Sequence, residues 1–194
     1  MLKRRREKKT DYRARLALVK SMQARLVVRR SLDNIHIQLV EYNKAGDATK
    51  TEVFSKKLQK YGWLYHGGSV PSAYLTGFLA GKMALSKGIS SAFLDIGLQT
   101  STKGSIIYAA ALGAKEAGLQ IPIGSGILPS SDRLTGRHIS EYAKKLKEDP
   151  KKYSRQFSNY IKINLDPENI AKNFAEVKNK IIAEFGNMED AANE

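Results

Sequence analysis

The chain has 194 residues and carries 33 Lys/Arg against 19 Asp/Glu, so its formal net charge at pH 7 is +14. It contains no cysteine, which excludes disulfides, thiolate metal sites and thiol nucleophiles and fits a reducing compartment. No apolar segment reaches transmembrane length, and the basic start lacks the apolar region of a signal peptide. We therefore expect a soluble, cytoplasmic protein with one well-packed domain, or one domain with a substantial extension.

The positive charge is concentrated in two blocks. The first thirty residues hold twelve Lys/Arg and only two acids, and residues 133–162, the second basic block, hold nine basic and three acidic residues. Two acids cannot pair the twelve cations of the first thirty residues, so this segment indicates a polyanionic partner. Nucleic acid is the first candidate, because Lys/Arg that displace counterions from phosphates supply sequence-independent affinity. The second basic block is also compatible with a solvated helix face, and both interpretations stay open.

The first third of the chain predicts one short helix and three strands. Thr10 is the expected N-cap of a helix that runs to Lys20. β-branched residues predict a strand over 24–30, and an alternating strand follows at 35–40, with His36 and Gln38 opposite its apolar face. A third strand is expected over 49–55. Short turns between these strands indicate an antiparallel meander.

Two helices and one further strand follow. Pro71 fits the first turn of a helix that ends before Gly88, in which Gly77 and Gly81 allow close backbone approach. A buried strand is predicted over 91–96, and a second helix over 105–117. The order indicates an α+β fold: an antiparallel or mixed sheet of three meander strands plus one further strand, with helices packed on one face, a basic N-terminal arm and a helical C-terminal extension.

The remaining residues predict loop, a basic helix from about His138 and a final helix from Asp166 to Gly186. We expect the core to be complete by Gly118, because the meander and the two helices bury each other. The proposed division of the chain is a basic RNA-binding arm with a short helix (1–20), an α+β core domain (21–118), a loop and helical extension (119–186) and a frayed tail (187–194).

The chain shows no catalytic or metal-binding constellation. His36, His66 and His138 are far apart and lack the spacing of metal ligands. Asp95 lies near the end of a buried strand with no second acid or base beside it, so we assign it a structural role, accepting backbone amides of the following loop. We predict no enzymatic activity, no metal, no cofactor and no small-molecule substrate.

The segment 100–105 resembles a phosphate-binding loop but lacks the Walker spacing. Its three hydroxyl groups, the ammonium group of Lys103 and its free amides precede a helix N-terminus, and together they suit one backbone phosphate. Ordinary helix capping explains the same residue types, and the sequence leaves the two alternatives open.

Many short runs, in order along nearly the whole chain, carry a resemblance to a known family. The sequence resembles the large-ribosomal-subunit protein that binds 5S rRNA, family eighteen of the large subunit, in its archaeal and eukaryotic form. The matching runs are TDY at 10–12 with Arg15, RLVVRRS at 25–31, Ile35 with QL at 38–39, YGW at 61–63, AYLTGFLAGK at 73–82, LDIGL at 94–98, TKGS at 102–105, ILPS at 127–130, and Gly136 with HI at 138–139.

The resemblance implies a non-enzymatic constituent of the large subunit that binds 5S rRNA and helps attach it to the large rRNA in the central protuberance. Its implied partners are 5S rRNA, large-subunit rRNA and neighbouring large-subunit proteins, without a membrane. The resemblance implies RNA contacts by Arg4, Arg5, Arg6, Lys8, Lys9, Tyr12 (by stacking), Arg13, Arg15, Arg25, Arg29, Arg30, Ser31, Asn34 and His36. Charge and position add Lys3, Thr100, Ser101, Thr102, Lys103, Gly104, Lys144, Lys145, Lys151, Lys152 and Arg155.

Two other classes of protein are alternatives. A basic RNA-modifying enzyme would need an acid, a base or a cofactor loop, and none is recognisable in the sequence. A nucleic-acid-compacting protein would need no large neutral middle segment such as residues 31–132, and the sequence shows no recognition helix.

Overall fold

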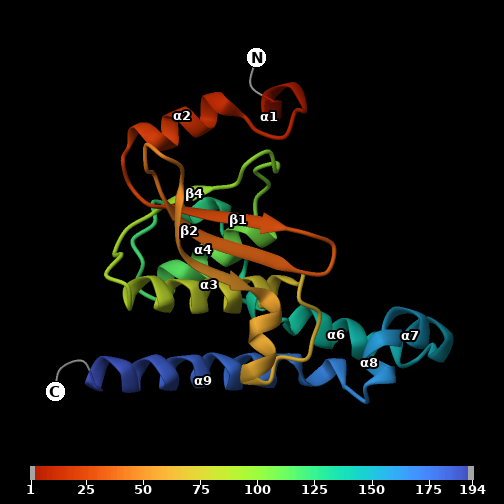
Figure 1. The fold of residues 1–194 in the computed structure, drawn as a ribbon. Coiled ribbons are helices and arrows are strands. Elements are labelled where there is room, and N and C mark those ends of the chain that lie inside the picture. The colour runs from red at the N-terminus through yellow and green to blue at the C-terminus, as the bar shows by residue number, and fades with distance from the viewer. Residues whose placement is uncertain (1–2, 192–194) are drawn as a thin grey trace.

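The computed structural model describes residues 3–191, with side chains described as far as Gly186, and places a four-stranded sheet between the basic arm and layers of helices (Figure 1). The strand order is β3-β2-β1-β4; β1–β2 and β2–β3 are antiparallel, and β1–β4 is parallel. The predicted α+β fold, with three meander strands and one further strand, is confirmed. The strands are β1 (Arg25–Arg30), β2 (Ile35–Glu41), β3 (Ala48–Phe54) and β4 (Phe93–Asp95).

Alternation along the strands sorts side chains onto two faces of the sheet. The inner face carries apolar residues that are at most 1% exposed, among them Leu26, Val28 and Ile37. The opposite face, here called the outer face, carries Arg29 beside His36 in the β1–β2 register. The predicted separation of His36 and Gln38 from the apolar side of β2 is therefore confirmed.

Two helices, α3 (Val70–Leu85) and α4 (Ile106–Glu116), cover the inner face of the sheet (Figure 1). Glycines let their backbones touch, as the sequence predicted. A Cβ atom on Gly77 would lie 1.9 Å from the carbonyl oxygen of Ala110, and one on Gly113 would lie 2.1 Å from that of Tyr74. No side chain fits at either position, so these glycines set the distance between the two helices.

Short helices connect these elements to the long C-terminal helix α9 (Ile170–Ala191), which lies along the side of α3 remote from the sheet (Figure 1). Helix α9 continues through Gly186, where we predicted its end, because one glycine weakens a helix without breaking it and no proline follows. None of the helices described is both long and apolar enough to span a bilayer. The connecting elements are η1 (Ser55–Tyr61), η2 (Ser125–Ile127), α5 (Ser131–Thr135), α6 (Arg137–Leu146), α7 (Pro150–Gln156), α8 (Ser158–Lys162) and η3 (Pro167–Asn169).

Helix α9 is part of the main hydrophobic core, so the expectation that the core is complete by Gly118 is wrong. Five of its side chains are at most 7% exposed and join the same cluster as the sheet and α3. The reason lies in α3, which buries thirteen of its sixteen residues and therefore needs cover on the side that the sheet does not reach. The five residues of α9 are Ile170, Phe174, Val177, Ile181 and Phe185.

The basic arm forms two helices, α1 (Lys3–Arg6) and α2 (Tyr12–Lys20), above the outer face of the sheet (Figure 1). Asp11, not Thr10, caps α2: its carboxylate accepts hydrogen bonds from the amides of Arg13 (2.9 Å) and Ala14 (3.2 Å). Both residue types cap helices, and a carboxylate gains additionally from the helix dipole. Thr10 instead accepts a hydrogen bond from Nε of Arg4 at 2.8 Å.

Candidate nucleic-acid interface

A cleft of about 580 Å³ separates the arm from the outer face of the sheet, and we call it the arm cleft. Cations line both of its walls: the arm supplies one set and strand β1 the other. Three carboxylates also reach the cleft, and each of them binds a neighbouring group of the protein. The charged residues that line it are Arg4, Lys9, Arg15, Arg25 and Arg29, with Asp11, Asp47 and Asp95.

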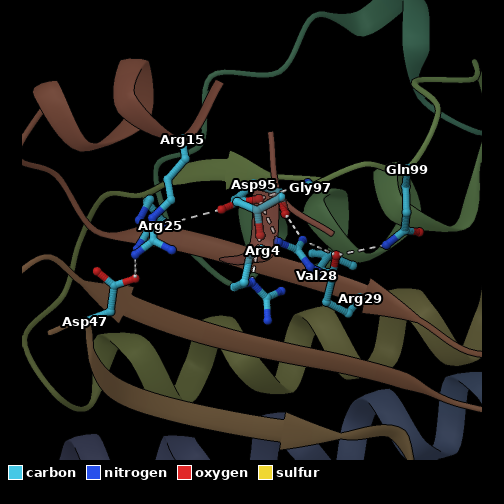
Figure 2. Close-up of polar contacts among 10 residues, drawn as sticks. Arg4, Arg15, Arg25, Val28, Arg29, Asp47, Asp95, Gly97 and Gln99 are labelled. Carbon is cyan, nitrogen blue, oxygen red and sulfur yellow. Dashed lines mark hydrogen bonds and ion pairs between the residues drawn. The ribbon is translucent and has the colours of Figure 1, made fainter. Parts of the chain in front are cut away.

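Asp47 links the arm to the sheet (Figure 2). Its Oδ2 atom accepts a hydrogen bond from Arg15 of α2 at 2.7 Å and another from Arg25 of β1 at 2.6 Å. The Arg25 side chain is only 4% exposed, and its other terminal nitrogen lies 3.3 Å from Asp95. Arg25 is therefore shielded from a ligand in this arrangement. It holds the two carboxylates in place, which differs from the surface contact predicted for it.

Asp95 positions Arg29 at the floor of the arm cleft (Figure 2). Its Oδ1 atom accepts from Nη2 of Arg29 and from the amide of Gly97, both at 2.9 Å. The bond to Gly97 confirms the predicted role of Asp95 as an acceptor for the following loop. Nη1 of Arg29 donates to the carbonyls of Asp95 (2.7 Å) and Val28 (2.9 Å), while the side chain remains 42% exposed. A fixed, half-exposed guanidinium group suits a phosphate oxygen.

Most predicted arm cations are exposed and free to bind a ligand. Lys9 pairs with Glu7 at 3.1 Å, Arg15 pairs with Asp47 at 2.7 Å, Arg4 donates a hydrogen bond to Thr10, and Tyr12 of α2 is half-buried. The others make no ion pair with any residue that the structure describes. These exposed cations are Lys3, Arg5, Arg6, Lys8 and Arg13, and Arg30 at the end of β1 joins them.

The predicted contacts in the β1–β2 turn use their polar atoms inside the protein. Ser31 and Asn34 hydrogen-bond each other across the turn, at 2.8–3.1 Å. His36 binds Glu52 at 2.5 Å, and its ring packs edge-on against Phe54. These residues shape the edge of the outer face, and their predicted contact with RNA stays a prediction.

The loop before α4 keeps free groups at its surface. Thr100, Thr102 and Lys103 are exposed and have no side-chain partner among residues 3–186. The Ser101 hydroxyl bonds to that of Tyr108, and the Gly104 amide donates to the carbonyl of Ile127 at 2.9 Å. Ser105 occupies the N-cap position, but its side chain caps no amide. Side-chain capping therefore does not account for this loop, and the predicted phosphate contact remains untested.

The second basic block lies on α6 and α7, level with the helical layers and away from the arm (Figure 1). Lys144, Lys145, Lys151 and Arg155 are exposed, whereas Lys152 pairs with Asp149 at 2.9 Å. The molecule thus presents two separate cationic surfaces. Sequence reasoning located both, but it missed Asp47, whose arginine partners are 22 and 32 residues away.

Comparison with known proteins assigns the family. The family model described as "Ribosomal large subunit proteins 60S L5, and 50S L18" matches residues 1–91. Over 180 residues the chain is 44% identical to the large ribosomal subunit protein uL18 of Methanococcus maripaludis, and this alignment covers 93% of each chain. The chain belongs to the uL18 family of large-ribosomal-subunit proteins. The resemblance predicted from the sequence is confirmed.

Membership of the uL18 family makes this protein a structural constituent of the large ribosomal subunit, within a ribonucleoprotein that carries out translation. The family model spans the arm, β1 to β3 and α3, and so includes every charged residue of the arm cleft except Asp95. The alignment with uL18 covers 180 of 194 residues and therefore includes the second basic block. Both cationic surfaces thus belong to the part of the chain that it shares with its relative.

Proposed function

We propose that this protein binds 5S rRNA and helps attach it to the large rRNA in the central protuberance of the large subunit. The observation that carries the proposal is the arm cleft, in which cations of α1 and α2 face Arg29 across an open space. Phosphates that enter this space meet basic side chains on two sides, and such contacts dominate the affinity of proteins for RNA backbones.

The proposed roles differ among the cations. Arg5, Arg6 and Arg13 would contact phosphates from the arm, and Arg29 and Arg30 from the sheet. Asp47 and Arg25 hold the arm at a fixed distance from the sheet, because each bridges groups on different elements. Tyr12 would stack on a base or a sugar, and the loop at 100–104 would extend the same surface.

The second basic block would serve a different part of the same assembly. We propose that the arm (1–20) and the core domain (21–118) together carry the 5S rRNA surface and that residues 119–194 contact the large rRNA and neighbouring large-subunit proteins. Figure 1 shows the arm helices α1 and α2 away from α6 and α7, which carry the second basic block, and this separation supports the division. The location that follows is the large subunit of cytoplasmic ribosomes.

The alternative of an RNA-modifying enzyme has little support. Among residues 3–186, no group of three His, Asp or Glu side chains is arranged to hold a metal ion. Asp95, the carboxylate that the sequence singled out, is occupied by two arginines and one backbone amide. Asp47 and Asp95 in the arm cleft therefore hold arginine side chains in place, as expected of a site that binds RNA rather than one that catalyses a reaction.

Filter binding of the full-length protein to 5S rRNA over a range of salt concentrations tests the proposal. Replacing Arg30 by Ala should weaken binding and lower the log–log salt slope by roughly one unit, because one phosphate contact is lost. Deleting residues 1–9 should lower the slope by several units. Lys172→Ala, which removes an exposed cation from α9, is the matched control and should change neither quantity. Equal affinity for 5S rRNA and an unrelated RNA of similar size would contradict the proposal.

A further inference from the structure

A groove of about 900 Å³, here called the aromatic groove, opens between the loop before α3 and helices α6 and α8, far from the arm cleft. Its floor is apolar and includes Leu64, Ile139 and Phe157. Three large apolar side chains at or beside it are strongly exposed: Leu64 (56%), Tyr142 (49%) and Ile163 (56%). The described part of the chain leaves all three exposed, and they gather at this one groove.

Five aromatic rings form a continuous series along this groove. From Tyr142 the series passes to Phe157 (6.5 Å between ring centroids), Tyr160 (6.0 Å), Tyr65 (5.5 Å) and Trp63 (5.2 Å). Packing explains the buried members, which join α6, α8 and the loop before α3. It does not explain why Tyr142, at the outer end of the series, keeps 49% of its surface exposed.

Polar groups without intramolecular partners surround the apolar floor. The side-chain amides of Gln156 and Asn159 and the ammonium group of Lys162 are exposed and bond to no described residue. Nδ1 of His138 donates to the carbonyl of Asp132 at 3.2 Å, which leaves Nε2 without a partner among the described residues. Donors and acceptors are thus available among the residues that line the groove.

A second cavity of about 410 Å³ adjoins the aromatic groove and shares Tyr65, His66 and Asn159 with it. Trp63 lines this cavity and is 1% exposed, and its indole N–H is buried without any hydrogen-bond partner among the described residues. Buried donors without a partner are rare in proteins. The protein itself thus leaves one donor unsatisfied at the inner end of the aromatic series.

Charge decides between the classes of ligand. The helices that line the groove, α6, α7 and α8, belong to the second basic block, which holds nine basic and three acidic residues over 133–162, and Lys162 of this block lines the groove itself. A protein partner that inserts an apolar side chain would cover the free amides and cations of the rim, leaving them unpaired or requiring a strongly acidic partner. Single-stranded RNA suits all three features of the groove. A base can stack on an aromatic ring, the edge of the base can hydrogen-bond the polar side chains, and the flanking phosphates can bind the lysines.

We propose that the aromatic groove binds an unpaired nucleobase of single-stranded RNA, stacked on Tyr142, with Gln156 and Asn159 at the base edge and the second basic block on the flanking phosphates. The proposal rests on the proposed function in that the RNA would belong to the ribosome. It adds base contacts to a surface for which charge alone indicated phosphate contacts.

The single tryptophan of the chain supplies the test, because Trp63 lies at the inner end of the aromatic series. Full-length protein is titrated with single-stranded hexamers of adenylate or uridylate, and tryptophan fluorescence is followed. Sodium polyphosphate, which carries charge but no bases, is the reference ligand. The hexamers should change the fluorescence of Trp63 at concentrations where polyphosphate does not.

Variants then separate stacking from charge. Tyr142→Ala should weaken hexamer binding on the order of tenfold, in line with the loss of one base–aromatic stack. Asn159→Asp, nearly isosteric, should weaken it through a carboxylate at the base edge. Tyr42→Ala is the matched control, because Tyr42 is a similarly exposed tyrosine (41%) outside the groove, and it should bind as the wild type does. Circular dichroism checks that each variant is folded.

The outcomes distinguish this proposal from the proposed function. Hexamers that bind no better than polyphosphate, or Tyr142→Ala binding equal to that of the control, would overturn the groove while leaving 5S rRNA binding intact. Poor incorporation of Tyr142→Ala into large subunits without any effect on hexamer binding would identify a protein as the occupant and also overturn it. Failure of the wild-type protein to bind 5S rRNA would count against the proposed function alone.

Discussion

The carboxylate of Asp47 accepts hydrogen bonds from two arginines, Arg15 of α2 in the arm and Arg25 of β1 in the sheet. Among residues 3–186, no other ion pair connects these two elements. Arg25 depends on this arrangement, because a guanidinium group that is 4% exposed must be paired to remain stable away from water. Asp47, in the β2–β3 turn, therefore connects the arm to the sheet.

Asp47→Asn should lower the free energy of unfolding by about 1–3 kcal/mol, because it leaves the buried charge of Arg25 only partly compensated. Urea denaturation at neutral pH measures the change, and limited trypsin digestion should cut the arm faster. Glu41→Gln is the matched control: Glu41 is exposed and pairs with Lys50 at the surface, so its replacement should cost no more than about 0.5 kcal/mol. Equal losses in the two variants would refute the special role of Asp47.

Of the two arginines on the outer face of β1, the sequence predicted the orientation of Arg29 but not the burial of Arg25. The alternation of β1 predicted that Arg29 points away from the core, and the structure places it at the floor of the arm cleft. The same alternation could not reveal that Arg25, four residues earlier on the same face, is buried. Its partners Asp47 and Asp95 are 22 and 70 residues distant, and their approach is a consequence of the tertiary fold.

At the scale of elements, the contact between α3 and α4 is the most constrained in the molecule. Gly77 and Gly113 each face the backbone of the opposite helix, so that even a methyl group would meet a carbonyl oxygen. The sequence predicted close backbone approach at Gly77 and Gly81, because glycine has no side chain. It could not identify the partner helix or the reciprocal glycine, since helix pairing is decided by the sheet on which both helices pack.

Gly77→Ala should therefore destabilise the protein by about 1–3 kcal/mol or more, as for other overpacked cores, because the two helices must separate. Thermal denaturation followed by circular dichroism gives the change. In Gly124→Ala the added methyl group meets no atom within 4 Å, and φ of Gly124 lies in an ordinary region, so that variant should melt as the wild type does. A wild-type melting temperature for Gly77→Ala would show that the helices are not in backbone contact.

The ends of elements were predicted less well than their existence. Thr10 and Asp11 are both good capping residues, and the choice between them depends on the turn that leads into α2. Helix α9 continues past Gly186, although glycine often ends a helix, because Gly186 does not adopt a left-handed conformation and no proline follows it. Caps and stops are local signals of about one kcal/mol, which tertiary packing readily overrides.

At the scale of the whole molecule, buried tyrosines join the C-terminal segment to the rest of the core. The hydroxyl of Tyr65 donates to the carbonyl of Asp166 at 2.8 Å, and burial, assisted by the charge of Asp166, raises the pKa of Tyr65 to about 12. Burial also raises the pKa values of Tyr61 and Tyr74. A phenol whose pKa is higher in the folded state contributes stability below its ordinary pKa near 10 and loses it as the pH rises further.

The free energy of unfolding should therefore be insensitive to this group below about pH 10 and should fall between about pH 10 and pH 12. In Tyr65→Phe the fall should be shallower, because one of the responsible phenols is gone, and stability at neutral pH should drop through loss of the hydrogen bond to Asp166. Urea denaturation at several alkaline pH values measures both effects. Tyr42→Phe should show the wild-type pH dependence, and an unchanged slope in Tyr65→Phe would contradict the assignment.

The division of the chain at Gly118 shows where local reasoning fails at this scale. The meander and the two helices form a plausible unit by themselves, and nothing near Gly118 predicts that α9 returns to it. The signal was present in α3, whose buried residues lie on all its sides and so require a second covering layer. A helix that is apolar all round indicates that another part of the chain packs against it, but does not identify which part.

Truncation to residues 1–118 should consequently yield a protein that does not unfold cooperatively. It removes the five buried side chains of α9, each of which stabilises the folded state by about 1.5–3 kcal/mol. Their sum, on the order of 10 kcal/mol, is comparable with the whole net stability of a typical domain, about 5–15 kcal/mol. Removal of α9 also exposes the side of α3 that is remote from the sheet. Thermal melts followed by circular dichroism measure the loss of cooperativity, and the fluorescence of Trp63 reports the change in its surroundings.

A chain shortened only by residues 187–194 is the matched control, since it keeps all five buried side chains, and it should melt cooperatively and bind 5S rRNA as the full chain does. The opposite result for residues 1–118 would be a sharp melt with 5S rRNA affinity within about tenfold of the full-length value, a loss of at most ~1.4 kcal/mol. That result would support the expectation from the sequence that the core is complete by Gly118, and it would show that α9 is not needed for folding or for 5S rRNA binding. The structure favours the first outcome, because the buried side chains of α9 belong to the same core as the sheet and α3.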